Sequence, residues 1–118
     1  MEDLTQKKCT ACTGGEPPVT SEEMAQLAPQ IPDWKIVEVE GESRLSSTYK
    51  FPDFKTALEF TNSVGAEAEN QGHHPALLTE WGKVTVTWWT HAISGLHEND
   101  FIMAAKTDRI ATGFAQKK

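Results

Sequence analysis

Three of the chain's four histidines lie between residues 68 and 91. His73 and His74 are adjacent and stand directly before Pro75, while His91 comes later in the same stretch. Imidazole is the side chain whose charge changes near neutral pH, so a group of histidines is suited to proton transfer, and it is also a common metal ligand. What these residues can do depends on whether the fold brings them together.

Three explanations of the histidine group are open from the residue types alone. A zinc site would need three or four converging ligands, and neighbouring side chains such as those of His73 and His74 diverge unless a turn bends them together. Histidines near a core can also serve only as hydrogen-bonded structural residues. Proton transfer needs less, because imidazoles on either side of a small substrate are sufficient. The residues therefore favour acid–base catalysis, and we expect no metal.

Helices that could position these histidines are predicted from capping residues and apolar periodicity. A capping box that starts at Thr20 begins a short helix. A long helix follows Asp53, with apolar residues on one face, and Gly72 is its natural stop. The last helix is expected to begin from a cap at Asn99 or Asp100.

Strands are predicted where apolar and polar residues alternate, in residues 33–40, 44–51, about 75–81 and 84–89. The order is therefore αββαββα. We expect an α+β fold in which a four-stranded antiparallel sheet carries three helices packed on one face. A turn at residues 82–83 would pair the last two strands, and their outer ends would then meet beside all three histidines.

Glu69 precedes His73 by four residues, so it lies within reach of that ring while the helix lasts and is expected to orient it. The C-terminal end of the helix adds partial negative charge near the same ring. His97, the fourth histidine, is expected to be a solvated loop residue.

Length and composition predict one domain with a tail. The chain has 118 residues, of which 38% are hydrophobic. We expect residues 1–18 to form a flexible tail, since they show no periodic apolar pattern, and residues 19–118 to form the domain. Cys9 and Cys12 form a single CxxC in that tail, and we interpret them as reduced thiols because a zinc site would need further ligands.

Charge and hydropathy argue against several classes of protein. The formal net charge is -6 and the basic residues are scattered, which disfavours nucleic-acid binding. No apolar run approaches the roughly 18 residues that a membrane span requires. The first residues also lack the apolar segment of a secretory signal, so we expect a soluble, cytoplasmic protein.

The spacing of the histidines and their neighbours forms a recognisable pattern. It reads Glu69, three residues, His73-His74-Pro75, five residues, Trp81, nine residues, His91, eight residues, Asp100. This pattern resembles the signature of the pterin-4a-carbinolamine dehydratases, and the resemblance extends over roughly residues 18–116. The sequence is most similar to the bacterial members that accompany phenylalanine hydroxylase, which also carry a CxxC tail.

This resemblance implies a reaction and a set of residues. Such enzymes dehydrate 4a-hydroxytetrahydrobiopterin to quinonoid dihydrobiopterin, which recycles the cofactor of aromatic amino-acid hydroxylation; the pterin is the substrate, and no further cofactor is implied. Carried over to this sequence, the catalytic and pterin-binding set is His73, His74 and His91, and the supporting residues are Glu69, Trp81 and Asp100. A core tryptophan and a helix cap remain equally open explanations of the last two.

The resemblance also bears on partners. It implies a small-molecule pterin as ligand and a homodimer or homotetramer, with two sheets joined edge to edge and tetramers possible through the long helices. An alternative function is a dimerisation or regulatory module, because mammalian relatives assist a transcription factor through their helical surface. That alternative would place a partner helix against residues 54–68.

Overall fold

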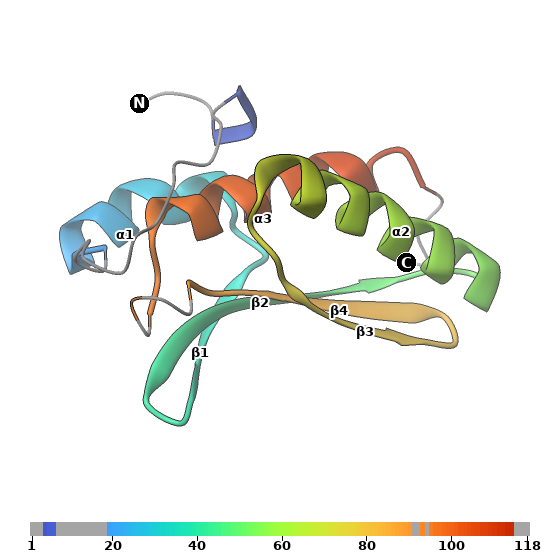
Figure 1. Cartoon of the computed structure of the whole chain (residues 1–118), viewed down its shortest axis with the longest axis horizontal. Coiled ribbons are helices and arrows are strands. Elements are labelled where there is room, and N and C mark those ends of the chain that lie inside the picture. The colour runs from blue at the N-terminus through green and yellow to red at the C-terminus, as the bar shows by residue number, and fades with distance from the viewer. Residues whose placement is uncertain (1–3, 7–18, 91–92, 94, 115–118) are drawn as a thin grey trace.

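Helices and sheet form two layers in the computed structural model, which describes residues 4–6, 19–90, 93 and 95–114. Three helices lie on one face of a four-stranded antiparallel sheet, and the other face is uncovered (Figure 1). The elements are η1 (Leu4–Gln6), α1 (Ser21–Leu27), η2 (Ala28–Gln30), β1 (Lys35–Val39), β2 (Glu42–Lys50), α2 (Phe54–Gln71), β3 (Ala76–Glu80), β4 (Lys83–Trp88) and α3 (Glu98–Ala111). The predicted α+β class and the order of its main elements are confirmed.

The sheet follows the order β1-β2-β4-β3, with each neighbouring pair antiparallel. In β4, Val84, Val86 and Trp88 are fully buried under the helices, whereas Thr85 and Thr87 face the uncovered side. This alternation is expected for a sheet covered on one face. The inward row of β4 ends at Trp88, next to the predicted site.

Helix α2 ends because of a single residue, Gly72, whose φ of 68° is left-handed. A residue with a Cβ is strained in that conformation, so glycine is favoured there. The N-terminal end is capped by Asp53, whose carboxylate accepts a bond of 2.7 Å from the Thr56 N–H. The predicted limits of this helix are thus confirmed, although Phe54 and Leu58, expected on its packed face, are exposed.

A polar cluster crosses the core between the sheet and the C-terminal half of α3. Tyr49 donates its hydroxyl hydrogen to Asp108, and the Trp34 indole N–H donates to the same carboxylate at 3.0 Å. Burial is the largest cause that raises the pKa of Asp108, and burial, followed by the bond to Asp108, raises that of Tyr49. The cluster ties β2 and the residue before β1 to α3.

Part of the expected tail contacts the domain. Leu4 is fully buried, its N–H donates to Gln30 Oε1 at 2.9 Å, and the Lys106 ammonium donates to the Thr5 carbonyl at 3.0 Å. The sequence did not predict this contact, because one leucine gives no periodic pattern. Cys9 and Cys12 lie outside the described residues. Among the helices that are described, none is long and apolar enough to cross a membrane.

Candidate active site

His73 lies just beyond the end of α2, where Gly72 turns the chain toward the start of α3. Its backbone N–H still donates to the Ala68 carbonyl at 3.2 Å, which closes the helix end. The ring is mostly buried, with 12% of the side chain exposed, and its Nε2 lies 2.6 Å from Oδ1 of Asp100. Its face stacks on Trp88, with ring centroids 5.6 Å apart and an angle of 12° between the planes.

Asp100 is fully buried in the first turn of α3. Its second oxygen, Oδ2, accepts the Thr90 hydroxyl at 2.8 Å and the His97 backbone N–H at 2.9 Å. Buried polar groups need such partners, and here each oxygen of the carboxylate has at least one. The carboxylate therefore joins three segments of the chain: the end of α2, the end of β4 and the beginning of α3.

His97 was predicted to be a solvated loop residue, and this prediction is wrong. It is the N-cap of α3: its Nδ1 accepts the Asn99 N–H at 3.0 Å, and Asp100 accepts the His97 N–H in return. The helix therefore begins two or three residues before the expected caps, Asn99 and Asp100. Histidine is an uncommon cap, so the preference for Ser, Thr, Asn and Asp pointed to the wrong position.

His74 forms the second histidine–carboxylate pair of the site. Its Nε2 lies 2.6 Å from Oε1 of Glu69, and both side chains are largely in solvent, 60% and 79% exposed. Glu69 was expected to orient His73, so its partner differs from the prediction. The four-residue spacing applies only within a helix, and the left-handed Gly72 intervenes before His73.

Trp81 does not lie at the histidine corner that His73, His74, Asp100 and Glu69 form in the same chain. It lies in the turn between β3 and β4 and is 71% exposed, so it is not a core residue. The five residues of β3 separate it from the histidines by roughly 17 Å, at about 3.3 Å per residue. His91 lies outside the described residues, although the residue before it, Thr90, binds Asp100.

Sequence reasoning did not assign the roles of Trp88, which stacks on His73, and of Thr90, which binds Asp100. The signal was present, because both belong to the inward row of β4 and its extension, at every second residue after Val84. In the described part of the chain, no group of three or more His, Cys, Asp or Glu side chains is placed to hold a metal ion.

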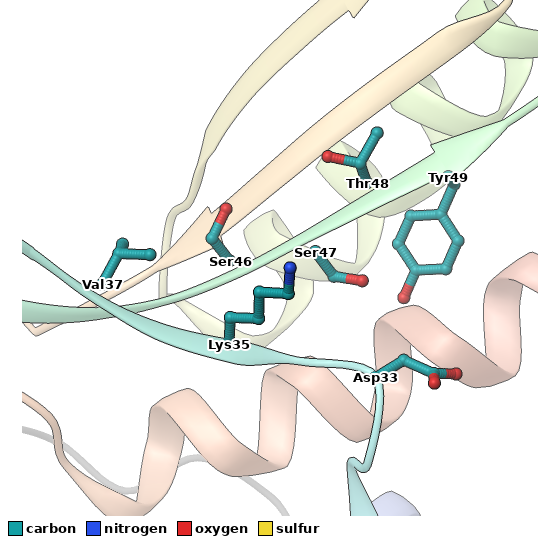
Figure 2. A pocket seen from close by; sticks show the side chains of 7 residues that line it. All are labelled: Asp33, Lys35, Val37, Ser46, Ser47, Thr48 and Tyr49. Carbon is teal, nitrogen blue, oxygen red and sulfur yellow. The ribbon is translucent and has the colours of Figure 1, made fainter.

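A separate hollow of about 390 Å³ opens at the sheet edge, where β2 continues past the start of β1 (Figure 2). It is lined by Asp33, Lys35, Val37, Ser46, Ser47, Thr48 and Tyr49. None of the predicted site residues lines it, and the Tyr49 hydroxyl within it is already bonded to Asp108. The histidine corner is therefore the better candidate for chemistry.

Comparison with known proteins identifies the family. The sequence model described as pterin 4 alpha carbinolamine dehydratase matches residues 17–110. A Gloeobacter violaceus protein that carries the name of a pterin-4-alpha-carbinolamine dehydratase is 61% identical over 109 residues, which is 92% of this chain and 94% of that protein. A protein of the same name from Microcystis aeruginosa is 58% identical over 110 residues, 93% of this chain and 95% of its own length.

A solved structure agrees with these sequence relatives. The crystal structure of a transcriptional coactivator/pterin dehydratase from Brucella melitensis has a TM-score of 0.71 and 33% identity, and the match covers 80% of this chain and 98% of that one. The fold and the sequence relatives thus define a dehydratase of the α+β class. The chain belongs to the pterin 4 alpha carbinolamine dehydratase family, and it is an enzyme of the hydro-lyase type.

Proposed function

We propose that this enzyme removes water from 4a-hydroxytetrahydrobiopterin by histidine acid–base catalysis. The single observation that carries the proposal is the pair of histidine–carboxylate bonds at one corner, between His73 and Asp100 and between His74 and Glu69. Such pairs hold an imidazole in one orientation. Membership in the pterin 4 alpha carbinolamine dehydratase family indicates which substrate is meant.

The reaction needs one proton donated and one removed. The C4a hydroxyl is a poor leaving group, so an acid must protonate it as the C–O bond breaks, and N5 must give up its proton as the C4a–N5 double bond forms. The products are quinonoid dihydrobiopterin and water, and the protons balance without an added cofactor. We assign these transfers to His73, His74 and His91, with Glu69, Asp100 and Trp81 in supporting roles.

This assignment has a direct test. Chemically generated 4a-hydroxytetrahydrobiopterin, mixed with the protein in a stopped-flow instrument, should lose water much faster than it does in buffer. An unchanged rate would refute the proposed function.

We further propose a cytoplasmic enzyme that regenerates the pterin used in phenylalanine hydroxylation. A coupled assay with a pterin-dependent hydroxylase should show a higher sustained rate when this protein is added.

We also propose a homodimer or homotetramer. All five residues of the edge strand β1 are exposed, including Ile36, Val37 and Val39. An uncovered edge with apolar side chains is a site for strand pairing. A second copy could also bring its own Trp81 toward a histidine corner. Sedimentation should give a species of at least twice the 13.1 kDa chain mass, and a monomer at micromolar concentration would contradict the proposal.

A second function, as a binding module, is favoured by one observation: the Brucella relative is described as a transcriptional coactivator as well as a pterin dehydratase. On this chain the candidate surface is the outer side of α2, where Phe54 and Leu58 are exposed. A partner recovered equally well by the wild type and by a His74→Ala variant, but lost in Leu58→Glu, would support a role independent of catalysis.

A further inference from the structure

Among the hydrogen bonds of the described residues, the His73 ring is held by its Nε2 atom alone. That atom lies 2.6 Å from Asp100 Oδ1, and no bond to Nδ1 is found in the described part of the chain. A neutral imidazole carries its hydrogen on one nitrogen and accepts with the other, so the partner of Nε2 decides which nitrogen is left to react. The position of that hydrogen is therefore a functional question.

Asp100 is placed to act as an acceptor toward His73. Its Oδ2 already receives two donors, the Thr90 hydroxyl and the His97 backbone N–H, and a backbone N–H can only donate. The N-terminal end of α3 adds partial positive charge, which favours an anion. An ionised carboxylate accepts only, so the nitrogen facing Oδ1 carries a hydrogen.

The plane of the His73 ring is fixed by Trp88. The two rings are nearly parallel, 12° apart, and Trp88 is itself fully buried and anchored by its indole N–H, which donates to Thr107 at 3.1 Å. Rotating the imidazole by half a turn would exchange the positions of its ring atoms and break the bond to Asp100. The stack and the carboxylate together leave one orientation.

We infer that Thr90 is a positioning residue, which acts through Asp100 to hold His73 with its hydrogen on Nε2 and so leaves Nδ1 as the nitrogen that exchanges protons with the pterin. The catalytic part of this inference rests on the proposed function. Thr90 is suited to the task because it is buried and its backbone is pinned independently, its N–H donating to the Gly95 carbonyl at 2.9 Å. Its hydroxyl is therefore free to serve Asp100.

The test compares two replacements of Thr90. Thr90→Val keeps the shape and the backbone pairing but removes the hydroxyl, whereas Thr90→Ser keeps the hydroxyl. Nitrogen-15 spectra of the histidine rings, recorded at mildly alkaline pH, distinguish a protonated from a bare ring nitrogen. In the wild type and in Thr90→Ser, His73 should show a protonated Nε2 and a bare Nδ1; in Thr90→Val, the signals should shift toward a mixture of the two tautomers.

Kinetics give a second readout. Losing one bond that orients the acceptor should lower kcat by about tenfold in Thr90→Val with KM changed by less than about twofold, since geometry and not pterin affinity is affected. Thr90→Ser should recover most of kcat. Thr61→Val is the matched control, because it removes from α2 a partly buried hydroxyl that lies 2.6 Å from the Thr79 hydroxyl of β3. It should leave the His73 spectrum and kcat unchanged.

Two results would overturn the inference: a wild-type His73 with its hydrogen on Nδ1, or a Thr90→Val variant with an unaltered spectrum and full kcat. A loss of kcat in Thr90→Val that merely follows a lower Tm, and that Thr61→Val reproduces, would also count against it. If the wild type fails to dehydrate the pterin, the proposed function fails, and the ring spectra of the same variants still decide whether Thr90 controls the His73 tautomer.

Discussion

His73 and His74 are neighbours in sequence, yet they belong to two different environments. Each has a carboxylate oxygen 2.6 Å from its Nε2. The His73 pair is buried, with Asp100 inaccessible to solvent, whereas the His74 pair is exposed on both sides. An exposed pair of this kind contributes about 0–1 kcal/mol, while removing one partner of a buried hydrogen bond costs about 1–3 kcal/mol, and more where the group left behind is charged. The two pairs therefore have the same Nε2–oxygen distance but contribute differently to the free energy of unfolding.

This difference shows how one corner can combine a ring of fixed orientation with a ring that exchanges protons with solvent. His73 is fixed by Asp100 and Trp88, so its orientation is set before substrate arrives. His74 is open to water, so a proton on its ring can exchange directly with solvent. Four substitutions with their matched variants separate the contributions of the two environments, a fifth lies outside both, and we take them from the largest expected effect to the smallest.

Asp100→Ala should have the largest effect. It leaves the Thr90 hydroxyl, the His97 N–H and the His73 ring without their shared acceptor, which should cost about 3 kcal/mol of unfolding free energy and lower the Tm by about 10 °C. Turnover measured well below the Tm should fall by at least about 100-fold. Calorimetry and kinetics on one preparation provide the measurement, and an unchanged Tm would show that the buried pair is not a structural centre.

His74→Ala should reduce turnover by about 100-fold and leave the Tm within about 2 °C of the wild type, because its pair is exposed. The matched variant is His73→Ala, which should lose a similar amount of turnover together with several degrees of Tm. If both variants lost stability equally, the contrast between the two environments would be refuted.

His97→Ala should remove the N-cap of α3 and cost about 1 kcal/mol. Because the same turn carries Asp100, turnover should fall by about threefold while the His74 environment stays unchanged. The control is His97→Asn, since asparagine is a good cap and should restore most of the stability. Full stability of His97→Ala in urea unfolding would mean that the cap observed here contributes nothing.

Glu69→Gln should be nearly silent in stability, with a change below about 0.5 kcal/mol, since the pair is in solvent. Turnover should drop less than about fivefold, because the substitution removes a charge beside His74 and not the ring itself. Added salt should weaken turnover of the wild type toward that of Glu69→Gln. A salt-independent difference would indicate a direct role of Glu69 with substrate.

Asp108→Asn tests a half-buried carboxylate of α3 outside the histidine corner, and no effect on turnover is expected. Burial raises the pKa of Asp108 above its ordinary 3.8, so the folded state binds this proton more tightly than the unfolded state. The stability that it contributes is complete below pH 3.8 and is lost as pH rises through the folded pKa. Urea unfolding at several pH values should therefore show the stability of Asp108→Asn rising relative to that of the wild type as the pH rises toward neutrality, and a relative stability that stays constant or falls would contradict this.

Local signals in the sequence were sufficient for the elements of this fold. The capping box at Thr20, the cap at Asp53 and the stop at Gly72 are all found, because each depends on chemistry within one turn of helix. The alternation in β4 likewise identified the buried Val84, Val86 and Trp88. Such patterns predict structure reliably because the residues that form and end each element are close together in the sequence.

The partners within the site could not be read from spacing. Glu69 pairs with His74 because Gly72 rotates the chain out of the helix, and His73 reaches a residue on α3 that is distant in sequence. The role of His97 and the burial of Leu4 also depend on contacts between separate elements. Trp81 matched the family pattern but lies in an exposed turn, because the spacing of a motif does not show which of its residues the fold brings together.

The contact between Leu4 and α3 has a practical consequence for labelling. Since Leu4 is buried and the Thr5 carbonyl is bonded to Lys106, a fluorophore attached at position 5 is held close to the helix that carries Asp100. Its anisotropy would therefore report the integrity of that helix during titrations. Position 5 can serve as a built-in probe of the helix that carries Asp100.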